Sequence, residues 1–112
     1  MTEDTALVGL HPALADTVRI ARAAVGLRVL KGVGEGRHQR RMDGLGYAVD
    51  LEPTQGVNAA AYEALAAAMF AAAVQRRCSL RWGADWNEDG ARRVALDQPR
   101  DPFSGHFELN AA

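Results

Sequence analysis

Two stretches of the chain repeat apolar residues at the spacing of an amphipathic helix. The first is predicted to begin at His11-Pro12, because proline is well tolerated in a first helical turn, and to end at Gly26. The second is predicted to begin at Asn58, whose side chain can cap a helix, and to continue through the alanine-rich segment that follows. The expected buried stripes are Leu14, Val18, Ala21 and Val25 in the first helix, and Tyr62, Leu65, Met69 and Ala72 or Ala73 in the second.

Four short apolar segments have the composition of strands. They are LRVLKG at 27–32, GYAVDLEP at 46–53, CSLRWG at 78–83 and HFEL at 106–109. A glycine-rich loop with one short helical segment follows the first strand, and in the polar segment before the last strand RRVAL is a candidate extra strand. The pattern predicts an α+β fold in which two main helices pack on one face of a small, mostly antiparallel sheet.

Length and composition fit one small globular domain spanning 1–112. Its 112 residues, 48% of them hydrophobic, suffice for a single core, with 1–8 as a loose N-terminal arm and 87–105 as a long inserted loop. A formal net charge of -1 gives no overall attraction to nucleic acid, which is not expected as a partner. The first residues lack the basic start and long apolar run of a signal peptide or membrane span, so neither export by a signal peptide nor membrane insertion is expected.

Residue types that bind metals stand at the ends of predicted strands. Asp50 ends the second strand, His106 begins the last one, and Asp43 precedes the turn that leads into the second strand. Zinc accepts histidine nitrogen and carboxylate oxygen, and a catalytic zinc site uses three protein ligands with a fourth position left to water. A carboxylate at a strand end is more often a turn cap, so the pattern alone leaves both interpretations open.

Four segments taken together resemble a known family. In chain order they are VGLHPAL at 8–14, GYAVDLEP at 46–53, RWGADW at 81–86 and GHFELN at 105–110. Their order and approximate spacing are similar to those of the phage L-alanyl-D-glutamate endolysins and related D-alanyl-D-alanine carboxypeptidases, which are zinc peptidases of peptidoglycan. The resemblance runs from about Leu10 to Asn110. It implies the fold of these peptidases, zinc as a cofactor and a peptidoglycan peptide as a partner.

The resemblance also assigns metal ligands. Asp50 matches the aspartate ligand of the family and His106 matches its final histidine ligand. The position of the family's first zinc histidine holds Asp43, which is therefore the expected substitute ligand, and Arg41 stands where a serine usually precedes it. His38 is a rival third ligand, since loss of a loop can bring it into range; beside three arginines, a solvated loop histidine is the competing interpretation.

This chain lacks an acidic residue at the position of the family's general base. The acid that stands three residues before the final histidine is replaced here by Phe103. Asp101, five residues upstream of that histidine, is the candidate base if the loop bulges. Glu108 is a weaker candidate, because it lies on the same face as His106 only if the last strand is regular.

The substrate groove implied by the resemblance is changed as well. The family's substrate-binding arginine is missing from the segment 32–35, whereas Gln39 still matches the glutamine that follows. The turn that carries Trp82, Asp85 and Trp86 is expected beside the groove, with core packing as the alternative for Trp82.

These departures favour a non-catalytic relative, because loss of one group that acts directly in catalysis typically lowers a rate by orders of magnitude. Such a chain is expected to be a structural or wall-binding module of a phage particle or tail, with peptidoglycan or other phage structural chains as partners, and its role would not require zinc, which can be present or absent. It would be associated with the virion or made in the host cytoplasm without a signal peptide. The alternative is an active zinc peptidase that cleaves peptidoglycan stem peptides, with Asp43, Asp50 and His106 as ligands and Asp101 as base.

Overall fold

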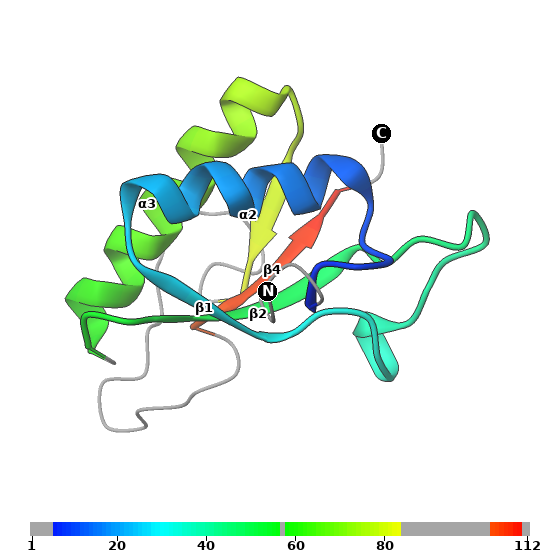
Figure 1. Ribbon diagram of the computed structural model, residues 1–112, viewed down its shortest axis with the longest axis horizontal. Helices are drawn as coiled ribbons and strands as arrows, with labels where there is room; N and C mark the ends of the chain where they lie inside the picture. Colours follow the sequence, from blue (N-terminus) through cyan, green and yellow to red (C-terminus); the bar gives the residue numbers. More distant parts are fainter. Residues whose placement is uncertain (1–5, 57, 84–103, 111–112) are drawn as a thin grey trace.

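The computed structural model describes residues 6–56, 58–83 and 104–110 and has the predicted α+β architecture. Two helices lie over a four-stranded sheet whose order is β1-β2-β4-β3, and every neighbouring pair of strands is antiparallel (Figure 1). The last strand is therefore a central one, inserted between β2 and β3. The strands are β1 (Leu27–Lys31), β2 (Ala48–Pro53), β3 (Leu80–Trp82) and β4 (His106–Leu109).

Both helices begin where the sequence predicts. In α2 (Pro12–Ala24) the Nδ1 atom of His11 accepts a hydrogen bond from the backbone N–H of Ala13, and in α3 (Ala59–Arg76) the Asn58 side chain accepts one from the N–H of Ala61. These side chains satisfy donors that a helix leaves without internal partners. The predicted stripes are buried apart from Val25, which is half-buried after the end of α2.

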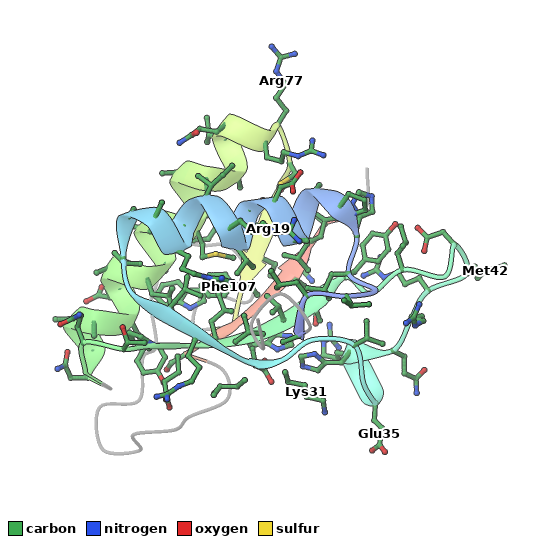
Figure 2. All side chains as sticks on the ribbon, in the orientation of Figure 1. Arg19, Lys31, Glu35, Met42, Arg77 and Phe107 are labelled. Carbon is green, nitrogen blue, oxygen red and sulfur yellow. The ribbon has the colours of Figure 1, made fainter. Side chains whose placement is uncertain are left out.

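Alternate residues of the strands face the helices and form the core. Val49 of β2 lies opposite Phe107 of β4, and Phe107 is fully buried. Its ring stacks on Trp82 at a centroid distance of 6.3 Å and meets Phe70 of α3 edge to face at 6.4 Å. Figure 2 labels Phe107 near the centre of the fold. Since large apolar side chains contribute about 1.5–3 kcal/mol each when buried, this layer fixes the position of β4 in the sheet.

The remaining residues of β2 and β4 point to the opposite face of the sheet. Asp50 lies opposite His106, and Ala48 lies opposite Glu108. Because strand side chains alternate, Asp50, His106 and Glu108 share the face that the helices leave uncovered. The short 3-10 helix η1 (Gly36–His38), in the connection between β1 and β2, packs against β2.

Several features predicted at the chain ends and in the long loop fall partly outside the described residues. Residues 1–5 of the predicted loose arm are outside, whereas Leu7 of the same arm is buried in the core. The predicted extra strand RRVAL and the loop up to residue 103 are outside as well. Within the described ranges, neither helix has the length and apolar character needed to cross a membrane.

Candidate metal centre

Strand register brings Asp50 and His106 together. They are Cα partners in the antiparallel pair of β2 and β4, and Nδ1 of His106 lies 2.6 Å from Oδ1 of Asp50. The pairing begins with a hydrogen bond of 2.8 Å from the N–H of Leu51 to the carbonyl of Gly105. Gly105 allows this approach, because a Cβ at that position would overlap the Leu51 carbonyl oxygen. Two of the ligands predicted from sequence therefore share one location.

The third member of the group is His38, which arrives from η1. The N–H of Gly34 donates to the carbonyl of His38 at 2.9 Å, so the loop folds back and carries the imidazole over the sheet. His38 is only 6% exposed, which shows that its interpretation as a solvated loop histidine was wrong. Its Nε2 lies 3.2 Å from Oδ2 of Asp50, and its ring meets the ring of His106 edge to face at 5.3 Å.

Each imidazole is oriented by a hydrogen bond on its outer nitrogen, meaning the ring nitrogen that faces away from Asp50. Nδ1 of His38 lies 2.8 Å from the carbonyl oxygen of Gly32, which can only accept, so this nitrogen carries the proton. Nε2 of His106 lies 2.9 Å from Oε2 of Glu108. Arg37 fixes that carboxylate in turn through a 2.6 Å bond from Nε to Oε2. The inner nitrogens, Nε2 of His38 and Nδ1 of His106, consequently point at the two oxygens of Asp50.

The charges within this group reinforce one another. Burial lowers the pKa of His106, but its hydrogen bonds to the carboxylates of Asp50 and Glu108 outweigh burial and raise the pKa above its ordinary value. Burial raises the pKa of Glu108, while its bonds from His106 and Arg37 outweigh this and lower the pKa. Glu108 is therefore held as an anion. Its carboxylate can accept a hydrogen bond from Nε2–H of His106 when Nδ1 of that histidine binds a metal ion.

A zinc ion fits this donor set. One ligand atom from each of His38, Asp50 and His106 lies within 4.8 Å of the others. Zinc ligands at about 2.0–2.2 Å from the ion stand roughly 3.3–3.6 Å apart in tetrahedral geometry. The 3.2 Å between His38 and Asp50 is close to this spacing, whereas the 2.6 Å between His106 and Asp50 is shorter, so a bound ion would have to separate that pair. Metal-bound histidines usually donate their other N–H to a carboxylate or carbonyl, as both do here. Two nitrogens and one oxygen leave a fourth position, which is the arrangement of catalytic zinc sites.

Asp43 does not join this group. Its carboxylate accepts hydrogen bonds from the Tyr47 hydroxyl and from the N–H of Leu45, and these bonds lower the pKa of Asp43. The segment around it is a tight turn, closed by a bond from the N–H of Arg41 to the carbonyl of Leu45. Figure 2 shows Met42, its neighbour, at the outer tip of the molecule. Asp43 thus acts as a turn cap, and His38, not Asp43, lies beside Asp50 and His106.

The other predicted site residues do not lie together in one groove among the described residues. Trp82 is 1% exposed and donates its indole N–H to the carbonyl of Ser104 at 2.8 Å, so it belongs to the core and does not line a groove. Gln39 lines a cavity, described next. Asp85, Trp86 and the candidate base Asp101 lie outside the described residues.

A basic cavity of about 330 Å³ adjoins the metal centre, and we refer to it as the arginine cavity. Its lining residues are Gly36, Arg37, Gln39, Arg40, Arg41 and Glu108. Glu108 is the wall that the cavity and the metal centre have in common, because its carboxylate contacts both Arg37 and His106.

Sequence reasoning underestimated His38 and gave Glu108 a different role. The only signal for His38 was indirect: the resemblance implies that a loop before Asp43 has been lost, which would change which histidine reaches the sheet. For Glu108 the signal was its two-residue spacing from His106, which in a regular strand puts both side chains on one face. Arg37 and Glu108 are 71 positions apart in the sequence, so no local sequence pattern predicts their contact.

Comparison with solved structures identifies a similar fold. The crystal structure of Serratia marcescens L-Ala D-Glu endopeptidase ChiX matches with a TM-score of 0.71 and 21% sequence identity, covering 96% of this chain and 86% of that chain. The two chains thus share a peptidoglycan peptidase-like fold. No protein-family model matches the sequence, and no curated protein matches it significantly.

Proposed function

We infer that this chain is a zinc-dependent peptidase that acts on peptidoglycan peptides. The observation that carries the proposal is the group of His38, Asp50 and His106, in which both histidines are buried and each is oriented by an acceptor on the nitrogen that faces away from Asp50. The two imidazoles present one nitrogen each to the same carboxylate, which brings together the nitrogen and oxygen donors that zinc accepts. The fold shared with a protein named as an L-Ala D-Glu endopeptidase supports a peptide of the cell wall as the substrate class.

Each residue of the group has a distinct part in this proposal. His38 would bind zinc through Nε2, His106 through Nδ1 and Asp50 through a carboxylate oxygen. Zinc, when bound, polarises a carbonyl and lowers the pKa of a bound water. Glu108 accepts a hydrogen bond from Nε2–H of His106 and so orients the imidazole ring, and Arg37 holds the Glu108 carboxylate by a second hydrogen bond. Glu108 is therefore a positioning residue, and we propose Asp101 as the general base.

A second candidate function is a non-catalytic wall-binding or virion module, with peptidoglycan or phage structural chains as partners. One observation favours it: Phe103 stands where the family has its catalytic acid, and Glu108 cannot replace that acid without breaking its bonds to His106 and Arg37. If Asp101 does not serve as the base, bound zinc would stabilise the fold and leave the chain able to bind a peptide but not to cleave it.

Incubation of the purified chain with an acetylated L-Ala-D-Glu-containing stem peptide, with and without one equivalent of zinc, separates the two candidates. The peptidase predicts zinc-dependent cleavage products in mass spectrometry, and a His38→Ala variant without activity. Asp43→Asn is the matched control, since it changes a carboxylate that caps a turn, and it should cleave at the wild-type rate. Zinc bound at one per chain with no cleavage would overturn the peptidase in favour of the module.

A further inference from the structure

His11 caps the start of α2 through an atom that can also take up a proton. Its Nδ1 accepts a hydrogen bond of 3.0 Å from the backbone N–H of Ala13. An imidazole nitrogen accepts a hydrogen bond only while it carries no proton, so the proton of neutral His11 is on Nε2. The cap of α3 differs, because the amide oxygen of Asn58 accepts from the N–H of Ala61 and does not titrate. The two helices therefore begin with caps that should respond differently to acid.

Protonation of His11 removes the acceptor. Both ring nitrogens of a charged imidazole are donors, so Nδ1–H would face the N–H of Ala13 and their bond would be lost. The charge would also stand at the N-terminus of a helix, where the aligned peptide dipoles disfavour a cation. Histidine is the side chain whose charge ordinarily changes between about pH 5 and pH 8. The start of α2 is thus expected to lose its cap in mildly acidic solution.

The turn that faces His11 carries a carboxylate that favours the charged imidazole. The ring of Tyr47 meets the ring of His11 edge to face at a centroid distance of 5.2 Å, and the Tyr47 hydroxyl donates to Asp43. Hydrogen bonds from Tyr47 and Leu45 and, to a smaller extent, the charge of a protonated His11 lower the pKa of Asp43. The attraction is mutual, so Asp43 promotes the form of His11 that cannot cap the helix.

Two arginines near His11 act in the opposite direction. Arg41 lies over the Tyr47 ring, with its Cζ 4.1 Å from the ring centroid, and Nη2 of Arg40 would be 2.8 Å from a Cβ added at Gly9. Both cations disfavour a charge on His11, but a guanidinium has no acceptor that could replace Nδ1. The first turn of α2 contains no acidic residue that could take over the cap. Loss of the acceptor therefore leaves the helix start without a substitute among these groups.

The capped segment is also bound to the connection that leads into β2. The N–H of His11 donates to the carbonyl of Gly46, and the N–H of Gly46 donates to the carbonyl of Gly9, each at 2.8 Å. Gly46 follows the turn that carries Asp43 and stands four residues before Asp50. An opening at the start of α2 would thus extend to this connection.

We propose that His11 is a pH-sensitive helix cap, which holds the first turn of α2 when neutral and releases it when protonated. The inference is independent of the proposed peptidase, because it involves neither a metal ligand nor a substrate. The cap stabilises the folded chain while His11 is neutral, so its contribution is present at higher pH and is lost as the pH falls. The expected change is local, an opening of the first turn of α2 and of the contact between 9–11 and Gly46.

Amide hydrogen exchange measured by NMR on three metal-free proteins tests the proposal. His11→Asn supplies an acceptor at every pH, as Asn58 does in α3, whereas His11→Ala supplies none. After correction for intrinsic exchange, the Ala13 amide of wild type should resemble that of His11→Asn at about pH 7.5 and that of His11→Ala at about pH 5. Its protection should fall about three- to tenfold over this range, while the Ala61 amide keeps its protection.

Thermal unfolding of the same proteins gives a second measurement. The melting temperature of His11→Asn should rise above that of wild type by about 3–8 °C more at pH 5 than at pH 7.5. Both proteins contain the same remaining titratable groups, so this difference isolates His11. A difference that is constant over the range would overturn the pH-sensitive cap. Equal losses of protection at Ala13 and Ala61, or an Ala13 amide that stays protected while the ring signals of His11 show its protonation, would overturn it as well.

Discussion

Replacing Gly105 by alanine should disturb both the fold and the metal centre. Gly105 directly precedes His106, and a Cβ added there would overlap the carbonyl oxygen of Leu51 and come within 3.3 Å of the Tyr62 ring. Real Cβ atoms essentially never approach other atoms closer than 3.0 Å, and the nearest of these neighbours is backbone. The start of β4 must therefore move away from β2.

The size of the effect follows from this geometry. Relief of the overlap requires a displacement on the order of 1 Å at the residue before His106, whereas zinc sites tolerate only about 0.2 Å in ligand distance. We expect zinc affinity to fall by at least about tenfold. Overpacking of a core typically costs about 1–3 kcal/mol, which lowers the melting temperature by roughly 5–20 °C in a domain of this size.

Thermal unfolding and competition with a zinc chelator measure the two consequences separately. Gly44→Ala is the control: Gly44 has a φ of 82° but no atom within 4 Å of an added Cβ, so only backbone strain of about 1 kcal/mol is expected. It should leave zinc affinity unchanged. A Gly105→Ala protein with wild-type melting temperature and wild-type zinc affinity would refute the claim that close contact between β2 and β4 positions His106.

Three further changes test other parts of the account. Glu108→Gln should lower zinc affinity about 10- to 100-fold in chelator competition, because an amide is a poorer acceptor for the Nε2 proton of His106; unchanged affinity would contradict the positioning role. Phe107→Ala should lower the free energy of unfolding by about 3–5 kcal/mol in urea titrations, since the ring is fully buried; a loss below 1 kcal/mol would mean that β4 is not central to the core. Asp16→Asn should lower the melting temperature slightly at neutral pH, because hydrogen bonding to Arg76 lowers the pKa of Asp16 and stabilises the folded state above the ordinary value of 3.8. That difference should disappear as the pH falls through the lowered pKa, and a difference that persisted at lower pH would argue against the ion pair.

The fold could be predicted largely from local pattern, because its signals are local. His11-Pro12 and Asn58 mark helix starts through bonds to residues two or three positions away. The helical stripes and the alternation in HFEL reflect repeats of 3.6 and 2 residues, which need no knowledge of partners.

The candidate metal centre could be predicted only in part, because its members come from three separate elements. Asp50 and His106 occupy strand ends that the resemblance recognises. The third ligand depends on the path of a loop, and nothing local distinguishes a histidine that folds over a sheet from one in solvent. Asp43 holds the matching place in the sequence, but the turn that brings Tyr47 and Leu45 onto its carboxylate directs it elsewhere.

Zinc binding to three proteins tests the central claim most directly: wild type, His38→Ala and Asp43→Asn. Each is titrated with zinc after removal of metal, and stoichiometry and affinity are measured by chelator competition. We predict one zinc per chain for wild type and for Asp43→Asn, and a loss of affinity of at least about 100-fold for His38→Ala. Loss of zinc in Asp43→Asn together with full retention in His38→Ala would contradict the assignment of His38, Asp50 and His106 as the metal ligands.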